Sequence, residues 1–399
     1  MSDLRYRTAG ESHGPAVLAI VEGVPAGLPL GGPAIDADLA RRQRGHGRSR
    51  RQLLERDRVR ILSGVKRGTT LGSPIALLVQ NADASIDRLP NLRAPRPGHA
   101  DLAGCLKFGT RDVRAILERA SARETVARVA AGAVSRALLR EFGIEVFGFV
   151  RAVGAARASP RSVPAWEGGP LDASGRAILE RARAARDASP LGTLDPRGGE
   201  RMRREVDRAT REGDTLGGVF EVVALGVPPG LGSFASAPER LDGRLAAALM
   251  SIPAVKGVEI GLGFGGASLP GSRAHDPILR AEGRGPKERR GWGGWIREGN
   301  RAGGLEGGVT NGQPLLVRGA MKPLPTLRRG LPSVNLETRA PERGTFQRSD
   351  VCAVPAASVV GEAAVAFEVA RALLDKFGGD TLAEVAAAHA SYLRSLDSI

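Results

Sequence analysis

The apolar residues between Ser121 and about Arg140 recur with the spacing of one face of a helix. They are Val126, Val129, Ala130, Ala133, Val134, Ala137 and Leu138. Ser121 and Glu124 form a capping-box pattern at the start of this segment. The pattern therefore predicts a helix from Ser121 to about Arg140, whose free amide groups at the N-terminus attract anions. Arg119 and Arg123 flank that start, either beside a bound anion or as solvated side chains of an ordinary capped helix.

A second pattern repeats along the whole chain. Segments 23–28, 36–40, 68–75 and 134–143 return, in the same order, as 226–231, 242–246, 308–315 and 369–378. We therefore predict one domain over 1–399 with two similar halves, approximately 1–150 and 215–399, and a peripheral excursion over 152–213 that contains one helix near 175–186. Each half reads strand, turn, helix, strand, glycine-rich turn, strand and helix, an α/β plan with helices layered on sheets. Chance similarity of Gly/Pro-rich turns is the alternative for the first and third pairs of segments.

Composition indicates an ordinary globular protein. Of the 399 residues, 42% are hydrophobic and 25% are charged, which allows one large core or two coupled ones. No apolar run approaches the roughly 20 residues of a membrane helix, and the N-terminal segment lacks the uninterrupted apolar stretch of a signal peptide. Cys105 and Cys352 match no metal-binding or redox spacing. We therefore expect a cytoplasmic protein with no membrane partner and no metal site.

The net charge of +15 attracts anions, which include nucleic acid, membrane surfaces and phosphorylated small molecules. Six of the 58 basic residues are lysines and the others are arginines. Aromatic residues make up 4% of the chain and are not interleaved with the basic runs, as base stacking would require. A phosphorylated small molecule is therefore favoured over nucleic acid as the partner, and a basic nucleic-acid-binding protein is the alternative from another class.

Two of the five histidines stand between small, turn-forming residues. His13 lies in the segment Gly10-Glu11-Ser12-His13-Gly14, and His99 lies in Pro95-Arg96-Pro97-Gly98-His99-Ala100-Asp101. Glycine and proline remove steric bulk and fix the backbone, which presents an imidazole to a ligand. Two such sites indicate a reaction with two protonations, and exposed turn histidines are the alternative.

Two further clusters carry candidate chemistry. Lys322 stands beside two prolines in residues 321–326, a rigid segment that would hold an ammonium and a hydroxyl group in place. Arg348 and Asp350 then place a guanidinium next to a carboxylate, ahead of the second-half helix. Asp350 is either a base or an ion-pair partner of Arg348.

Two glycine-rich segments are further candidates for ligand contacts. Residues 280–301 are basic and carry Trp292 and Trp295, as either a mobile lid over an anionic ligand or a solvated loop. Residues 261–266 match the dinucleotide fingerprint letter for letter. Pro270 and Gly271 follow where the pyrophosphate-binding helix should run, so we exclude a dinucleotide fold there.

Seven segments taken together resemble the chorismate synthase family over essentially the whole chain, in the order found in that family. They are 8–14, 41–48, 95–101, 118–125, 303–308, 322–326 and 348–350. The family converts 5-enolpyruvylshikimate 3-phosphate to chorismate and phosphate by 1,4-anti elimination, a carbon–oxygen lyase reaction of the shikimate pathway and aromatic amino acid biosynthesis that needs reduced FMN. The resemblance implies a β-α-β sandwich, a homotetramer and an anionic small-molecule substrate.

The resemblance also implies roles for individual residues. His13 would protonate the departing phosphate, His99 would lie by the flavin, and Asp350 would remove the proton on the opposite face. Arg42 and Arg48 would hold the substrate, or NADP. The FMN site would comprise Arg119, Ala120, Ser121, Pro253, Ala254, Gly307, Lys322, Pro323, Leu324, Pro325, Thr326 and Arg348.

The chain departs from the family pattern at three positions among others. Ala120 stands where a second serine is common, Pro253 stands where many members have asparagine, and Ser349 stands where others have histidine. Two questions stay open at this level. Either the protein reduces its own flavin with NADPH or an external flavin reductase does so, and a flavin oxidoreductase acting on another anion is a third candidate function.

Overall fold

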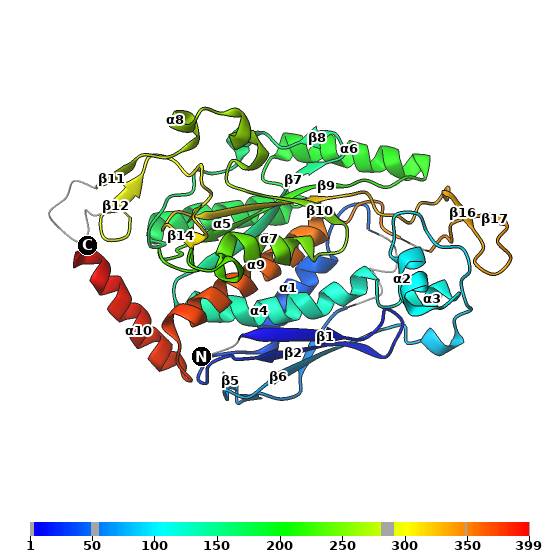
Figure 1. Ribbon diagram of the computed structural model, residues 1–399, viewed down its shortest axis with the longest axis horizontal. Coiled ribbons are helices and arrows are strands. Elements are labelled where there is room, and N and C mark those ends of the chain that lie inside the picture. The colour runs from blue at the N-terminus through cyan, green and yellow to red at the C-terminus, as the bar shows by residue number, and fades with distance from the viewer. Residues whose placement is uncertain (1–3, 49–55, 281–290, 348, 399) are drawn as a thin grey trace.

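Two antiparallel β-sheets with long helices between them form the centre of the structure (Figure 1). The structure is a computed structural model and describes residues 4–48, 56–280, 291–347 and 349–398. The first sheet has the order β1 (Arg5–Ala9), β2 (Ala16–Glu22), β6 (Ile75–Gln80), β3 (Val59–Ile61). The second has the order β10 (Val255–Ile260), β15 (Leu315–Met321), β9 (Gly218–Leu225), β7 (Glu145–Val153), β8 (Ala156–Arg157). The sandwich that the resemblance implied is confirmed.

The helices form two layers (Figure 1). Between the sheets lie α1 (Gly32–Gln43), α4 (Thr125–Glu141), α7 (Leu241–Met250) and α9 (Val354–Phe377), and over the outer face of the second sheet lie α5 (Ala173–Ala188) and α6 (Pro196–Glu212). The remaining helices, α2 (Asp101–Phe108), α3 (Val113–Leu117), α8 (Gly271–Ala274) and α10 (Leu382–Ser395), lie at the ends and edges. The outer face of the first sheet has no helix over it in Figure 1.

Short elements connect these layers. Small hairpins are formed by β4 (Val65–Lys66) with β5 (Thr69–Thr70), β11 (Ile278–Arg280) with β12 (Trp295–Arg297), β13 (Leu305–Glu306) with β14 (Val309–Thr310), and β16 (Pro332–Val334) with β17 (Pro341–Arg343). Short 3₁₀ helices are η2 (Ile86–Arg88), η3 (Ala122–Glu124), η4 (Pro160–Ser162), η5 (Ala237–Glu239), η6 (Gly263–Ser268) and η7 (Leu396–Ser398). The fingerprint-like residues 261–266 thus form a turn and part of η6, which is followed by the four-residue helix α8.

The two sheets have the same strand order. The strands β1, β2, β6 and β3 of the first sheet correspond, in that order, to β7, β9, β15 and β10 of the second. The chain visits the corresponding strands in the same sequence, and α1 and α4 then correspond to α7 and α9. This correspondence supports the predicted two halves. Because β7 belongs to the second sheet, we propose that the second half begins at β7 and that β8, α5 and α6 form the excursion. The helix predicted near 175–186 is α5.

The helix predicted from Ser121 is present, but its start is different. The segment opens with the 3₁₀ turn η3, and α4 proper begins at Thr125. The predicted capping box is wrong: the Ser121 hydroxyl accepts a hydrogen bond from the Arg123 amide at 3.3 Å, whereas the Glu124 carboxylate accepts from Thr8 and Arg128. Thr8, which is distant in sequence, and Arg128, one turn further along the helix, therefore take the Glu124 side chain in place of the local cap.

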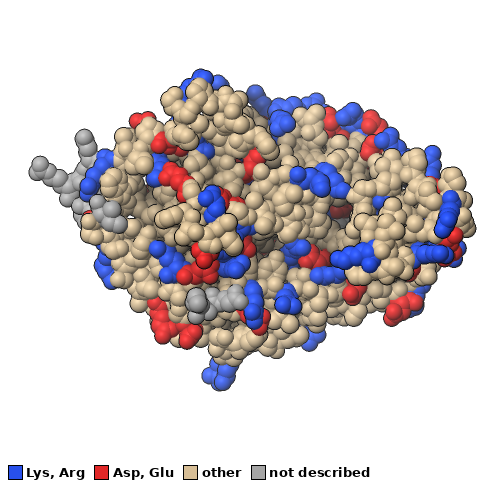
Figure 2. Space-filling model, in the orientation of Figure 1, with Lys and Arg blue, Asp and Glu red and all other residues tan. Residues whose placement is uncertain are grey.

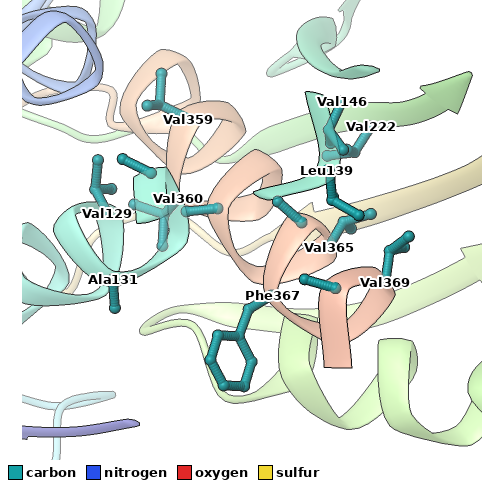
Figure 3. Close-up of a cluster of buried hydrophobic side chains, with 14 of the residues drawn as sticks. Val129, Ala131, Leu139, Val146, Val222, Val359, Val360, Val365, Phe367 and Val369 are labelled. Atoms are coloured by element: carbon teal, nitrogen blue, oxygen red, sulfur yellow. The ribbon is translucent and has the colours of Figure 1, made fainter. Parts of the chain in front are cut away.

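The main core lies where α4 packs against α9 and both sheets close over them (Figure 3). Val129 of α4, Val360 and Val365 of α9 and Val222 of β9 are all buried there. Gly132 permits the close approach of the two helices, because a Cβ at this position would lie 2.3 Å from the Cβ of Ala363. Close packing of this kind keeps the N-termini of α4 and α9 side by side.

A buried ionic cluster fastens the same helices. Glu362 of α9, with a side chain 1% exposed, accepts hydrogen bonds from Arg41 of α1 at 2.6 Å and from the Gly148 amide of β7 at 3.0 Å, and lies 2.8 Å from Arg136 of α4. Burial opposes the charge on Glu362, but Arg136 and Arg41 outweigh it and lower its pKa below the ordinary value. The ionised carboxylate therefore ties four elements together.

Candidate functional site

A cavity of about 410 Å³ opens where the N-termini of α4 and α9 meet the turn 95–101 and the segment 321–326. This volume lies within the range of small-molecule sites. Thirteen of the residues predicted for the site line it: His13, Arg42, Arg48, His99, Ala120, Ser121, Pro253, Ala254, Lys322, Leu324, Pro325, Thr326 and Asp350. Residues from both halves of the chain therefore form one site.

His13 lies in the turn between β1 and β2, and its neighbours fix that turn. Gly10 has a φ of +105°, and a Cβ there would lie 2.3 Å from the Ala16 carbonyl oxygen, so this position requires glycine. The Asn81 side-chain amide donates to the carbonyl oxygens of Glu11 and Gly14, at 3.0 and 2.6 Å. The small residues around His13 thus serve the backbone geometry that the sequence predicts.

The His13 ring contacts a buried carboxylate. Its Nδ1 lies 2.9 Å from Oε2 and 3.0 Å from Oε1 of Glu118, and the His13 amide donates to the same Oε2 at 2.9 Å. Burial opposes ionisation of Glu118, but the hydrogen bonds from His13 and Arg114 outweigh it and lower its pKa. A histidine next to an ionised carboxylate is a suitable proton donor.

His99 has a matching arrangement at the start of α2. Its Nδ1 is hydrogen-bonded to Asp101, a side chain with no exposed surface. Arg96 donates to both oxygens of Asp101, through Nε at 2.8 Å and Nη2 at 3.0 Å, and to the Thr326 hydroxyl at 2.8 Å. Burial opposes the Asp101 charge, yet the hydrogen bonds from His99 and Arg96 prevail and lower its pKa.

Positive charge dominates the cavity wall. Its described lining includes one carboxylate, Asp350, and five cations: Arg42, Arg48, Arg96, Arg123 and Lys322. Asp57 braces two of the cations, at 3.5 Å from Arg42 and 2.6 Å from Arg123. The first turns of α4 and α9 also reach the cavity, and helix N-termini favour negative charge. The site is therefore built for an anionic ligand with more than one charged group.

Asp350 forms an ion pair across the cavity wall. Its Oδ2 accepts from Nη1 of Arg48 at 2.6 Å, and the two side chains are 13% and 9% exposed. The Nε of Arg48 is buried and has no hydrogen-bond partner within residues 4–48, 56–280, 291–347 and 349–398. Arg348, the partner that the sequence suggested for Asp350, lies outside the described residues.

Three predicted residues do not line the cavity. The Arg119 guanidinium donates to the carbonyl oxygens of Gly10 and Thr8, at 3.0 and 3.1 Å, and so supports the His13 turn. Pro323 lies within the segment 322–326 without reaching the cavity. Gly307 lies in the β13–β14 hairpin, where a Cβ would contact Phe234. Their predicted contact with FMN stays a prediction.

The segment 280–301, considered as a lid or as a solvated loop, lies away from the cavity where the structure describes it. Residues 281–290 lie outside the described residues, and the described parts of 280–301 contribute nothing to the cavity lining. Strands β11 and β12 pair at the end of the molecule opposite the N-termini of α4 and α9 (Figure 1). Trp292 and Trp295 there line a second cavity with Leu396. The described part of the segment therefore does not cover this cavity, and the choice between a lid and a solvated loop stays a prediction.

Sequence reasoning missed three residues of the site. Glu118 and Asp101 hold the two imidazoles, and Arg96 lines the cavity beside Arg123, one of the two arginines considered for a bound anion. All three stand inside segments that attracted attention for other reasons: Asp101 follows His99 by two positions, and Glu118 precedes Arg119. The spacing between the paired residues, 105 positions for His13 and Glu118, carries no local signal.

Ala254 is strained where it lines the cavity. Its φ is +70°, in the left-handed region, while its carbonyl oxygen accepts from the Lys322 amide at 2.9 Å. We expect Ala254→Gly to raise the free energy of unfolding by about 0.5–1 kcal/mol, because glycine enters this region without a Cβ penalty. Urea denaturation measures the change. As the control, Ala320→Gly in β15 should lower stability by a similar amount; equal effects of both variants would contradict the strain.

Comparisons with known proteins agree with this geometry. The family model for "Chorismate synthase" matches residues 4–374. The chain is 54% identical over 405 residues to a chorismate synthase of Desulforudis audaxviator and 51% identical over 402 residues to one of Geobacter sulfurreducens, with 98% of each chain covered in both cases. A crystal structure of chorismate synthase superimposes with a TM-score of 0.79 at 43% identity, covering 99% of both chains.

Proposed function

The chain belongs to the chorismate synthase family of carbon–oxygen lyases, and from that premise we propose that its cavity binds 5-enolpyruvylshikimate 3-phosphate beside reduced FMN and eliminates phosphate to give chorismate. The observation that carries this proposal is the pair of imidazoles, each tied to a buried carboxylate, in a single cationic cavity. Two positioned proton carriers and one base suit an elimination that moves a phosphate and a proton.

The lining suits a flavin mononucleotide as well as the substrate. Small and apolar side chains that leave room for a flat ring include Ala120, Ala254, Ala353, Ala356 and Val360. The buried Nε of Arg48, which has no hydrogen-bond partner in the described part of the chain, and the ammonium of Lys322 suit phosphate and carboxylate groups. Reduced FMN supplies, when bound, electron density that helps the phosphate to leave.

The chain's own residues then divide the proton traffic. His13 donates a proton to the departing phosphate, and the Glu118 carboxylate stabilises the charged imidazole. His99 holds a proton at the cofactor side of the cavity, where Arg96 and Thr326 keep its turn in place. Asp350 accepts the proton lost from the opposite face of the substrate ring. Substrate and cofactor that fill the cavity would exclude water from these transfers.

An anaerobic assay tests this function. Enzyme, reduced FMN and 5-enolpyruvylshikimate 3-phosphate should release phosphate and form chorismate without net oxidation of the flavin. Phosphate release that does not depend on reduced FMN, or hydride transfer to the substrate, would contradict the proposal. Tight, salt-dependent binding of random DNA without phosphate release would favour a nucleic-acid-binding protein. Figure 2 does not favour that alternative, because basic and acidic side chains are interspersed over the face that it shows.

The same assay addresses the source of electrons. Arg42 and Arg48 carry guanidinium groups that also suit the phosphates of NADPH. We propose that the flavin is reduced either by NADPH at this site or by an external flavin reductase. Turnover with NADPH and oxidised FMN alone supports the first route, and turnover that requires an added reductase supports the second.

Arg48 offers the sharpest test of substrate binding. We expect Arg48→Ala to raise the KM for the substrate by about 10–100-fold, because a charge-assisted hydrogen bond contributes about 1.5–3 kcal/mol. Arg48→Lys should recover only part of this, since an ammonium cannot reproduce the planar fork. Steady-state kinetics at saturating reduced FMN measure both variants. An unchanged KM in Arg48→Ala would remove Arg48 from the substrate site.

We propose that the protein is a homotetramer and that the uncovered face of the first sheet is one of its interfaces. Ile20 is 48% exposed on that face, and Leu18 and Leu78 beside it are half-buried. Apolar side chains on an uncovered sheet face mark an association surface. Ile20→Asp should therefore lower the mass measured by light scattering during gel filtration. Glu180→Lys on α5 is the control, and an unchanged mass in Ile20→Asp would contradict this interface.

We also propose a cytoplasmic location. Cys105 and Cys352 are both free and buried, as expected in a reducing compartment. Among the described helices, none is long and apolar enough to cross a membrane.

A further inference from the structure

Each of the two site histidines is bonded through the same ring nitrogen to a buried carboxylate. His13 contacts Glu118, whose side chain is 2% exposed, and His99 contacts Asp101, whose side chain has no exposed surface. The two pairs come from different elements: Glu118 follows α3, and Asp101 begins α2. The same contact at both imidazoles indicates a requirement of the site rather than a local packing solution.

The chemistry of the carboxylates fixes where the histidine protons lie. Both carboxylates accept hydrogen bonds from arginines as well, Glu118 from Arg114 at 3.3 Å and Asp101 from Arg96 at 2.8 and 3.0 Å. Buried among cations and donors, both are ionised, and an ionised carboxylate only accepts. The Nδ1 of each histidine must therefore carry the proton.

One contact near His99 allows a different reading, and the same chemistry removes it. Nη2 of Arg96 lies 3.0 Å from the His99 Nδ1 and could donate to an unprotonated nitrogen. That arrangement would leave an unprotonated Nδ1 facing the ionised Asp101 oxygen, with two lone pairs in contact. Nη2 instead donates to Asp101 Oδ1, and Nδ1–H donates to the same atom.

We propose that Glu118 and Asp101 are positioning residues for the reaction: each accepts the Nδ1 proton of its histidine, so that both imidazoles meet the ligand through Nε2. In the His13 pair the carboxylate also accepts the backbone amide of the same residue, which fixes the ring relative to its own main chain. In the His99 pair the Arg96 bond to Thr326 extends the network to the segment 322–326. The role in catalysis rests on the proposed function, whereas the tautomers do not.

The carboxylates also fix the route by which each ring exchanges a proton. With Glu118 and Asp101 accepting from Nδ1, each histidine takes up and returns a proton through Nε2. Without the carboxylates, neutral rings would turn and exchange tautomers.

Nitrogen NMR of ligand-free protein labelled at histidine tests the inference directly. At pH values where the rings are neutral, His13 and His99, assigned with His13→Gln and His99→Gln, should both show a proton on Nδ1 and none on Nε2. A proton on Nε2 in either neutral ring overturns the proposal. This measurement uses the wild-type chain, so it does not depend on a variant that folds.

Variants separate positioning from a purely structural role. Glu118→Gln should allow a proton on Nε2 of the neutral His13 ring and leave the His99 tautomer unchanged, and Asp101→Asn should do the reverse. Glu118→Asp, which keeps a carboxylate, should preserve the His13 tautomer. Glu124→Gln, which removes a nearby carboxylate bonded to Thr8 and Arg128, should change neither tautomer. Unaltered tautomers of both histidines in Glu118→Gln and Asp101→Asn overturn the proposal.

Kinetics connect the tautomers to the reaction. In Glu118→Gln we expect kcat to fall by about 10-fold or more with KM nearly unchanged, because a His13 ring that is no longer held with its proton on Nδ1 delivers a proton through Nε2 less well. Correct tautomers in a protein that shows no FMN-dependent phosphate release would leave the positioning intact and refute the proposed function. Normal turnover in Glu118→Gln with a changed His13 tautomer would refute the positioning role alone.

Discussion

Replacing Asp350 with asparagine is expected to lower kcat by about 10²-fold or more at saturating substrate and reduced FMN. The amide keeps the shape of the carboxylate and can still accept a hydrogen bond from Arg48, which donates to Asp350 at 2.6 Å. It cannot accept a proton, so the step after phosphate departure loses its base. Anaerobic turnover, followed by phosphate release and chorismate absorbance, measures the effect.

The Arg48 pairing supplies the control for this experiment. If Asp350 only neutralises Arg48, Asp350→Asn should behave as Arg48→Ala does, with a raised KM and a kcat that recovers at saturation. If Asp350 is the base, Asp350→Asn should instead lower kcat and leave KM little changed. Substrate deuterated at the carbon that loses the proton adds a second readout, because proton removal should become more rate-limiting in the variant. Full turnover in Asp350→Asn would assign the residue to the ion pair.

Replacing Glu362 with glutamine is expected to lower the free energy of unfolding by about 3–5 kcal/mol. The variant removes a charge that lies 2.6 Å from Arg41, 2.8 Å from Arg136 and 3.7 Å from Arg186. Within the described residues, Asp38 would then be the one remaining carboxylate shown for the two buried guanidinium groups of Arg41 and Arg136, and uncompensated buried charge costs far more than a lost surface pair. Urea denaturation, with the m-value checked for two-state behaviour, measures the loss.

Glu368→Gln on the same helix is the matched control. Glu368 pairs with Arg244 at 2.9 Å on a partly exposed surface, and its loss should cost about 1 kcal/mol or less. The folded-state pKa of Glu362 is lowered, so its contribution is complete above the unfolded pKa of about 4.3 and is lost as pH falls through the folded value. Equal stabilities of the two variants would show that the cluster contributes little.

Patterns within short segments predicted local structure well, because periodicity and turn residues act over a few positions. The helical face after Ser121 and the helix near 175–186 are present, and the repeated segments are matched by two sheets of equal strand order. The start of α4 was wrong because Glu124 finds Thr8, 116 positions away, instead of its local cap. A pattern of neighbouring residues cannot show that Thr8 competes with the local cap for the Glu124 side chain.

The site shows the same division between local and distant information. The turns around His13 and His99 indicated presented imidazoles, and both line the cavity. The carboxylates that hold them could not be assigned, because only folding brings Glu118 to His13. The suggested partner of Asp350 was its neighbour Arg348, which lies outside the described residues, and the structure adds Arg48, 302 positions away. Ion pairs between distant segments need the fold before they can be predicted.

The division of the cavity wall between both halves has a consequence for how the protein is made. Its lining runs from Ser12 to Val360, so on the ribosome the first sheet and α4 emerge long before the N-terminus of α9 can complete the wall. A ligand stabilises only the state that binds it. Neither substrate nor cofactor can therefore assist the early half while synthesis continues, and that half must remain soluble through its own core until the chain is almost finished.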